Sequence, residues 1–322
     1  MRSGSRPICA LPFAREARAP VSKPLIRLGT RSFITLQRVL PHHGLSRAVH
    51  ALARSRIVPL KRALISAFMR GYRPDLEDAV EPDPRRYASF NDFFTRPLRA
   101  GARPLGGDEH TLVSPVDGTV AEIGYLDDLT MLQAKGRKYT LDALLAGRSD
   151  WTERLAGGAF ATLYLAPYNY HRIHMPLAAR LRAAWYVPGR LFSVSPATAA
   201  TLSGLYARNE RIVCLFEGAA PDGGTLPFAL VLVGALLVGS MATVWHGEVT
   251  PRRPRRPMEL ATASVGRHAA SPLARGAEMG RFNMGSSVIL VLGRDALTWR
   301  PEILAGKHIK VGQPLGTLRD RA

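Results

Sequence analysis

The dipeptide Gly285-Ser286 is the feature of this sequence that points most directly to chemistry. A serine Oγ can attack the carbonyl carbon of the preceding residue, which replaces the peptide bond by an ester. Glycine suits that preceding position because it has no Cβ and tolerates unusual backbone angles. Elimination of the ester leaves dehydroalanine, which hydrolyses to a pyruvoyl group and ammonia. The plainer interpretation is that the dipeptide merely starts a strand over residues 287–292.

Such an attack needs a base near Oγ and a group that orients the base. His174, in the sequence Tyr-His-Arg-Ile-His-Met-Pro, is the candidate base, and Asp117, in Ser-Pro-Val-Asp-Gly-Thr-Val, is the candidate acid that orients it. The chain order Asp117, His174, Ser286 is one of the orders used by nucleophilic triads. Each motif also has an ordinary interpretation, because Pro-Val-Asp-Gly is common turn chemistry and a buried histidine can simply be part of the core.

A metal site is not expected. His171 and His174 are three residues apart, which places them on one face of a helix but on opposite faces of a strand. No nearby carboxylate cluster completes a ligand set. The two cysteines, Cys9 and Cys214, are far apart and suggest neither a disulfide framework nor a zinc site, so the expected compartment is reducing.

Basic charge is concentrated at the N-terminus. The chain has a net charge of +19, and its first 72 residues hold 14 Lys and Arg residues against one acid, Glu16. In this region Ile57, Leu60, Leu64 and Phe68 recur at helical spacing between basic residues. That pattern is typical of an amphipathic helix in a lipid interface, although a helix packed on its own domain would look the same.

One stretch, residues 223–245, carries no charge and is long enough for a hydropathy scan to flag it. A proline and several glycines interrupt it, and residues 228–238 have the Val- and Leu-rich character of a buried strand. A buried strand and peripheral membrane attachment are therefore preferred to a membrane span.

The remaining pattern predicts an α+β protein. From about residue 87, short apolar runs bounded by Gly, Pro and Asp indicate strands, for example at 159–165, 211–216 and 287–292. Short helices are expected at 141–145 and around 196–205. The spacing of Gly276, Met279, Gly280 and Phe282 is repeated at Gly312, Leu315, Gly316 and Leu318, which suggests two equivalent turns in a barrel or sandwich.

Together the motifs resemble the phosphatidylserine decarboxylases, specifically the bacterial-type enzymes that carry a pyruvoyl group. The resemblance covers roughly residue 33 to the end. It departs from the family pattern where the usual Leu-Gly-Ser-Thr reads Met284-Gly285-Ser286-Ser287, a change that keeps the side-chain volume and the hydroxyl. Five further segments also look like family landmarks: residues 89–98, 187–194, 207–211, 238–240 and 243–245.

The resemblance implies a proenzyme with a β-rich, barrel- or sandwich-like core and amphipathic helices at the N-terminus. It would cleave itself at Gly285-Ser286 into a β chain, 1–285, and an α chain, 286–322, which stay together as a heterodimer. Ser286 would become a covalent pyruvoyl group that forms a Schiff base with phosphatidylserine and yields phosphatidylethanolamine and CO2. His174 is carried over to the cleavage triad, and His171 to the substrate carboxylate or the proton.

The expected organisation is a disordered basic tail (1–30), an amphipathic membrane-associating segment (31–75) and a catalytic core (76–322). The protein is expected on the cytoplasmic side of the cell membrane, bound peripherally to an anionic surface, with no nucleic-acid partner. Two alternatives remain. One is a serine hydrolase using Asp117, His174 and Ser286, although its nucleophile lacks the usual Gly-x-Ser-x-Gly elbow. The other is a non-enzymatic basic lipid-binding module, which would have no use for the three motifs.

Overall fold

The computed structural model describes residues 35, 37, 41–133, 135–236, 240–249, 256–262, 272–283 and 285–320. The expected basic tail, 1–30, lies outside this part of the chain. The helices are α2 (His42–Ala53), α3 (Val58–Tyr72), α4 (Phe90–Phe94), α5 (Leu141–Leu145), α6 (Ser149–Leu155), α7 (Pro196–Ala199) and α8 (Leu205–Arg208). The strands are β1 (Thr111–Val113), β2 (Gly118–Tyr125), β3 (Thr130–Gln133), β4 (Arg137–Thr140), β5 (Gly158–Leu165), β6 (Arg172–His174), β7 (Ala179–Val187), β8 (Arg211–Ala219), β9 (Thr225–Val233), β10 (Met241–Thr243), β11 (Gly247–Val249), β12 (Met258–Thr262), β13 (Glu278–Phe282), β14 (Ser286–Arg294), β15 (Leu297–Trp299), β16 (His308–Ile309) and β17 (Pro314–Leu318).

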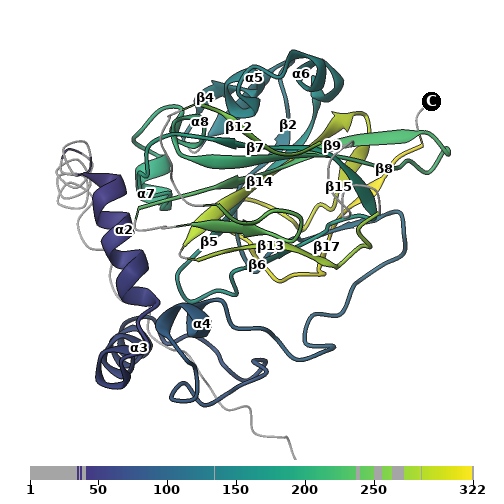
Figure 1. Ribbon diagram of the computed structural model, residues 1–322. Helices are drawn as coiled ribbons and strands as arrows, with labels where there is room; N and C mark the ends of the chain where they lie inside the picture. The colour runs from purple at the N-terminus through teal and green to yellow at the C-terminus, as the bar shows by residue number, and fades with distance from the viewer. Residues whose placement is uncertain are drawn as a thin grey trace, which may run out of the picture.

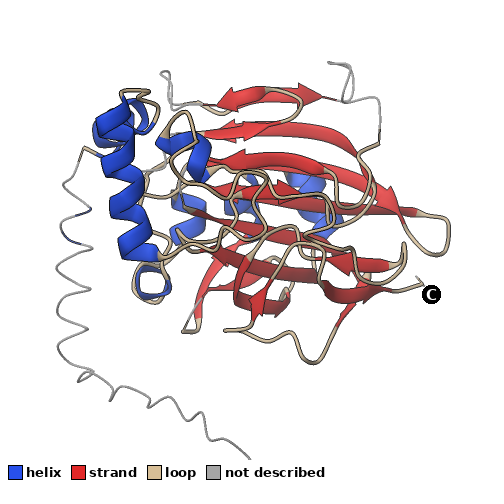
Figure 2. Cartoon of the chain, turned by 90° about the horizontal axis from the view of Figure 1, so that it is seen from below, coloured by secondary structure: helices blue, strands red, loops and turns tan. Residues whose placement is uncertain are grey.

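An antiparallel eight-stranded sheet, in the order β12-β7-β8-β9-β14-β5-β2-β16, forms the centre of the molecule. A four-stranded sheet (β11-β10-β13-β6) and a three-stranded sheet (β1-β17-β15) lie against one face, and α5, α6 and α8 cover the other (Figure 1). Figure 2 shows the strands in layers, with the long helices at one end of them. The expected α+β class and sandwich-like core are confirmed. The large sheet is open, with β12 and β16 as its edges among the described residues.

The middle strands are apolar throughout because both faces of the sheet are covered. Along β9, Phe228, Leu230 and Leu232 belong to the core against the small sheets, while Val231 and Val233 belong to the core under the helices. The charge-free stretch 223–245 is thus largely a buried strand, although β9 ends at Val233, earlier than the pattern predicted. Among the described residues, no helix has the length and apolar character needed to cross a bilayer.

The two predicted glycine turns are confirmed. Gly276 and Gly312 have φ angles of +80° and +81°, a conformation that L side chains rarely adopt, and each leads into a strand, β13 or β17. Both turns lie against the same side chain, since a Cβ added to either glycine would touch Leu105. The repeat in the sequence therefore corresponds to two similar turns, each with a positive-φ glycine before a strand. The short helices expected near 141–145 and 196–205 are also present, as α5, α7 and the start of α8.

Helix α2 is tied to the core at both ends. Near its start, the backbone N–H of Leu191 donates to Nδ1 of His42 at 3.2 Å. Near its end, His50 and Arg54 both contact the carboxylate of Glu248, at 2.8 and 2.7 Å. These contacts fix the orientation of α2 relative to the sheet.

Helix α3 packs on α4 through aromatic rings. The ring of Phe68 lies 5.4 Å from that of Phe90 and 5.9 Å from those of Phe93 and Phe94, centroid to centroid. Leu64 packs against the same cluster. Leu64 and Phe68 therefore contact the protein's own α4, as the packed-helix interpretation expects, and both side chains stay half-buried.

Candidate active site

The predicted nucleophile and acid lie at the same end of the large sheet. Ser286 is the first residue of β14 and lies opposite Leu165, the last residue of β5. On the far side of β5 is β2, whose first residue, Gly118, is so close to Tyr164 that an added Cβ would overlap the Tyr164 carbonyl oxygen. Asp117 immediately precedes Gly118. Because adjacent strands are about 4.8 Å apart, the main chains at Asp117 and Ser286 are roughly 10 Å apart.

The histidine segment joins the other two through its main chain. The N–H of His174 donates to the carbonyl of Pro115 at 2.8 Å, and the N–H of Phe282 donates to the carbonyl of His171 at 3.0 Å. Strand β6 also pairs with β13, which runs toward the predicted cleavage site. All three motifs that the sequence singled out therefore converge at one place, although they are far apart in the chain.

Ser286 is fully buried, and its Oγ has no hydrogen-bond partner among the described residues. The same holds for Ser287 Oγ, and the side-chain oxygen of Asn283 also lacks a donor. Buried polar atoms are nearly always paired, so unsatisfied atoms on both sides of Gly285 single out this segment as one that needs an explanation. Met284, where the sequence departs from the family pattern, lies outside the described residues.

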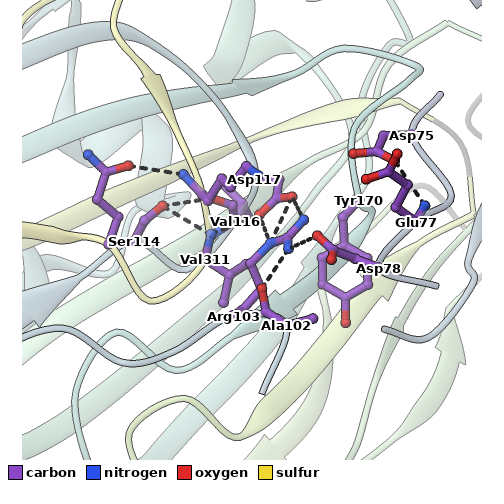
Figure 3. A network of polar contacts seen from close by, with 12 residues as sticks. Asp75, Glu77, Asp78, Ala102, Arg103, Ser114, Val116, Asp117, Tyr170 and Val311 are labelled. Atoms are coloured by element: carbon purple, nitrogen blue, oxygen red, sulfur yellow. Dashed lines mark hydrogen bonds and ion pairs between the residues drawn. The ribbon is translucent and has the colours of Figure 1, made fainter. Parts of the chain in front are cut away.

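Asp117 is held by an arginine rather than by the predicted base (Figure 3). Arg103 binds it through both Nε and Nη2, with Nη2 2.7 Å from Oδ2, and the N–H of Val311 donates to Oδ1 at 2.8 Å. Arg103 also pairs with Asp78 at 2.6 Å. Burial alone would lower the pKa of Arg103, but the hydrogen bonds to Asp117 and Asp78 raise it. The guanidinium is therefore permanently charged.

His174 is held by two other groups. Its Nδ1 lies 2.8 Å from the carbonyl of Gly276, and its Nε2 lies 3.0 Å from the hydroxyl of Tyr170. A carbonyl only accepts, so Nδ1 carries the proton and Nε2 keeps its lone pair, which accepts from Tyr170. Burial lowers the pKa of His174, opposed by the Gly276 carbonyl and by the charges of Glu278 and Asp117. The ring is thus a neutral base, and the direct hydrogen bonds expected among Asp117, His174 and Ser286 are not formed in this conformation.

A cavity of about 300 Å³ opens beside this ring. His174 and Tyr170 line it together with three arginines, Arg99, Arg103 and Arg275. The cavity gives the His174 side of the site an opening with a strongly basic wall.

His171 lies in a more buried environment than His174. It is fully buried, and its ring stacks on Phe94 with centroids 4.1 Å apart and planes inclined by 22°. Its Nε2 lies 3.4 Å from the carbonyl of Pro167, while Nδ1 has no partner among the described residues. Burial, helped by the charge of Arg96, lowers the pKa of His171 to about 3. The imidazole is therefore neutral, with one free nitrogen.

Several residues of the site had no role assigned from the sequence. Phe94 and Arg96 belong to a segment recognised only as a landmark, and Tyr170 to the histidine motif. Arg103 stands in an irregular loop, and no pattern in the sequence marks it. The Gly276 carbonyl is a main-chain group, and only the turn repeat drew attention to its residue.

Comparison with known proteins agrees with this geometry. The family model described as phosphatidylserine decarboxylase matches residues 90–317, and a second model, described as PSD, matches residues 32–73. Relatives named phosphatidylserine decarboxylase proenzyme include those of Ectopseudomonas mendocina (44% identical over 89% of this chain and 98% of the relative), Chromobacterium violaceum (45%, 90% and 100%) and Nitrosococcus oceani (47%, 88% and 90%).

The match to the first model contains Asp117, both histidines and the whole of Gly285-Ser286, so the residues that converge in the structure are those that the family model spans. A similarity of this degree, over nearly the full length of each relative, does not arise from a shared fold alone. This chain belongs to the phosphatidylserine decarboxylase family.

Proposed function

We propose that this chain is a proenzyme that cuts its own backbone between Gly285 and Ser286 and then decarboxylates phosphatidylserine to phosphatidylethanolamine. The observation that carries the proposal is the fully buried Ser286, whose Oγ has no partner among the described residues and which directly follows a glycine. The relatives' common name, proenzyme, fits a chain that must be processed. No specific observation favours the hydrolase or the non-enzymatic alternative.

Self-cleavage follows from the chemistry of these two residues. Ser286 Oγ attacks the carbonyl carbon of Gly285, its proton passes to a base, and the C–N bond breaks to give an ester and a free amine. Loss of the Cα proton then expels the Gly285 carboxylate and leaves dehydroalanine at position 286. Hydrolysis consumes one water, releases one ammonia and leaves a pyruvoyl group at the start of the new chain.

His174 is the base in this proposal. Its Nε2 keeps a lone pair because the Gly276 carbonyl holds the proton on Nδ1 at 2.8 Å. That carbonyl occupies the place on the ring that the sequence assigned to Asp117. Asp117 then acts through its charge, which favours a protonated His174, while Arg103 fixes its position. Tyr170 must release Nε2 before the ring can take the serine proton.

The site also fits the pyruvoyl group that the family implies. Ser286 supplies the carbons of the group, and the unsatisfied polar atoms of Ser287 and Asn283 are available to its oxygens. When formed, a pyruvoyl group supplies a ketone conjugated to an amide, which withdraws electrons from an amine substrate as CO2 leaves. His171 offers a neutral nitrogen, Nδ1, that can accept a hydrogen bond from the substrate ammonium. That nitrogen is buried away from bulk solvent.

The two products of cleavage would stay associated. The α chain, 286–322, contains β14, which lies in the middle of the large sheet and pairs with β5 on one side and β9 on the other. Its side chains from Val288 to Leu292 are completely buried. Removing this chain would dismantle the central sheet, so the heterodimer should be as stable as the fold itself.

Peripheral membrane attachment through α2 and α3 is part of the proposal. Leu52, Ile57, Val58 and Tyr72 are exposed apolar side chains on or beside these helices, with 42–62% of their surface accessible. An apolar cavity of about 310 Å³ also opens between the two helices. Exposed apolar side chains among basic residues suit an anionic lipid surface.

The intact mass of the purified protein under denaturing conditions tests the proposal. We expect two polypeptides, residues 1–285 and residues 286–322 with a pyruvoyl N-terminus, in place of one 35.1 kDa chain. The Ser286→Ala variant should give the single chain and no decarboxylation, because it has no hydroxyl. Active protein that consists of one intact chain would refute self-cleavage.

A further inference from the structure

Arg96 is a buried cation with no carboxylate partner. It follows α4, only 3% of its surface is exposed, and it forms no ion pair among the described residues. Its Nη2 donates to the main-chain carbonyls of Asp75 and Tyr168 at 3.2 and 3.4 Å, whereas Nε and Nη1 have no acceptor in the described structure. Asp117 and Asp75 act on it through their charge but form no direct ion pair with it, and a buried charge without a direct counter-ion is costly. Nε and Nη1 are thus buried hydrogen-bond donors that lack an acceptor in the described structure.

This guanidinium lies beside the proposed reaction centre. The carbonyl that it contacts, that of Tyr168, is adjacent in the chain to the carbonyl of Pro167, which accepts from Nε2 of His171. Phe94, two residues before Arg96, stacks on the His171 ring. Arg96 and His171 are therefore anchored to the same short loop, between the end of β5 and the start of β6.

We propose that Arg96 binds the phosphate of the substrate's phosphodiester headgroup, an inference that rests on the proposed function. A guanidinium presents a planar fork of N–H groups that matches two phosphate oxygens, and Nε with Nη1 forms such an edge. Bound there, the phosphate would fix the headgroup with its amino-acid end at His171. The charge of the phosphate would also supply the counter-ion that Arg96 lacks.

The phosphate is a better partner than the substrate carboxylate. The carboxylate loses its charge as it departs as CO2, so a cation that held it would stabilise the substrate more than the transition state. The phosphodiester keeps its charge throughout the reaction. Arg96 should therefore contribute to binding equally in substrate and transition state, which predicts an effect on KM and little effect on kcat.

Apolar side chains near α3 offer a surface for the acyl chains of a bound phospholipid. Phe94 also contacts Phe68 of α3, with ring centroids 5.9 Å apart, and Phe68 lines the apolar cavity between α2 and α3. Packed aromatic contacts thus connect the apolar cavity between α2 and α3 with the His171 ring. A phospholipid whose phosphate sits on Arg96 would have apolar surface available for its chains.

Binding of soluble headgroups to the purified protein tests the inference without requiring turnover. sn-Glycero-3-phosphoethanolamine carries the phosphodiester and amine but no carboxylate, ethanolamine lacks the phosphate, and inorganic phosphate lacks the rest of the headgroup. We expect Arg96→Met to weaken binding of the phosphodiester ten- to a hundredfold and to leave ethanolamine binding unchanged. Arg86→Met, which removes an exposed arginine outside the site, is the matched control and should change neither.

Steady-state kinetics provide a second test of the phosphate assignment. With dispersed phosphatidylserine, Arg96→Met should raise KM at least tenfold while kcat stays within about threefold and the α chain still forms at its normal mass. Arg96→Lys keeps the charge but loses the fork, so it should bind with intermediate affinity; it also decides the question if Arg96→Met does not fold. Unchanged phosphodiester binding and KM in the lysine variant would overturn the assignment.

Two outcomes distinguish this inference from binding of free phosphate and from the proposed self-cleavage. If inorganic phosphate binds as tightly as glycerophosphoethanolamine, the site recognises free phosphate and the assignment to a lipid headgroup is wrong. If the protein binds the phosphodiester through Arg96 but remains a single uncut chain without activity, self-cleavage fails while the binding assignment stands.

Discussion

The carboxylate of Asp117 is bound by Arg103, with Nη2 2.7 Å from Oδ2, and the ring of His174 is held instead by the Gly276 carbonyl and the Tyr170 hydroxyl. The acid and the base of the predicted triad are therefore both fixed, each by its own partners. This arrangement changes what substitutions at the site should do. It turns the acid from a hydrogen-bonding partner of the base into a charge in its neighbourhood.

Asp117→Asn should slow self-cleavage by about ten- to a hundredfold and leave the precursor folded. The loss is moderate because only an electrostatic contribution of roughly 1.4–2.8 kcal/mol to the barrier is removed. An acid in direct contact with its histidine typically contributes about 10⁴-fold. The rate is measured by following the α chain by mass spectrometry after synthesis.

Asp78→Asn is the matched control for that variant, since Asp78 also pairs with Arg103, at 2.6 Å. It should cleave within about threefold of the unmodified rate. A loss of 10⁴-fold in Asp117→Asn alone would contradict the charge-only role and indicate that the carboxylate moves onto His174 in the reacting conformation.

Tyr170→Phe should preserve self-cleavage or accelerate it. The Tyr170 hydroxyl occupies Nε2 of His174 at 3.0 Å, and removing it leaves the lone pair free without altering the aromatic ring. His174→Ala, by contrast, should leave a folded but essentially uncut precursor because no base remains. Both variants are compared by the fraction of cut chain against time. If Tyr170→Phe blocks cleavage as fully as His174→Ala, the tyrosine participates in the proton transfer.

The fold was largely predictable from the sequence, whereas the side-chain partners of the site were not. Strands β5, β8 and β14 were evident because apolar runs bounded by Gly, Pro and Asp reflect burial, which is a local property of the chain. The two turns at Gly276 and Gly312 were evident because a positive φ requires a particular residue type. The apolar runs and the turn glycines can both be recognised from residues that are close together in the sequence.

The contacts that decide the chemistry depend on tertiary packing instead. Arg103 and Asp117 approach through irregular loops with no periodicity, and the Gly276 carbonyl meets His174 across 102 residues of chain. Helix α3 is a further case, because its pattern could not tell lipid from an aromatic cluster on α4 as the partner of Phe68. The sequence shows that one face of the helix is apolar, but only the tertiary structure shows what packs against that face.

Acid should destabilise the protein through His171. Burial lowers the folded-state pKa of His171 to about 3, while the unfolded chain titrates near the ordinary histidine value of 6.5. Below pH 6.5 His171 is therefore protonated in the unfolded state but not in the folded state. The free energy of unfolding falls as the pH drops from about 6.5 toward 3. Between pH 7 and pH 5 this one group should remove about 2 kcal/mol from the free energy of unfolding.

Urea unfolding at the two pH values measures this effect. The comparison is best made in the Ser286→Ala background, where a single chain can unfold in one transition. Introducing His171→Leu there should reduce the loss between pH 7 and pH 5 by about 2 kcal/mol relative to the parent. An equal decrease in the free energy of unfolding in both proteins would show that His171 is protonated in the folded state or is exposed to solvent.

Membrane attachment should depend on the exposed apolar side chains of the helical segment, Leu52, Ile57 and Val58, whose accessible surfaces are 42%, 62% and 47%. Raising the salt from 0.1 M to 1 M shortens the Debye length from about 10 Å to about 3 Å and should weaken binding to anionic vesicles without abolishing it. The remaining attachment comes from apolar burial, worth roughly 1.5–3 kcal/mol for each fully buried side chain.

The triple change of Leu52, Ile57 and Val58 to Ser should therefore release the protein from sedimenting vesicles at 1 M salt. Activity on a soluble short-chain substrate should be retained, because none of the three side chains belongs to the aromatic cluster of Phe68 and Phe94. A matched control replaces exposed apolar residues elsewhere on the surface and should stay bound: Val80, Tyr125 and Leu304. If salt alone releases the unmodified protein completely, charge is the whole of the attachment, and the exposed apolar side chains of α2 and α3 do not enter the lipid.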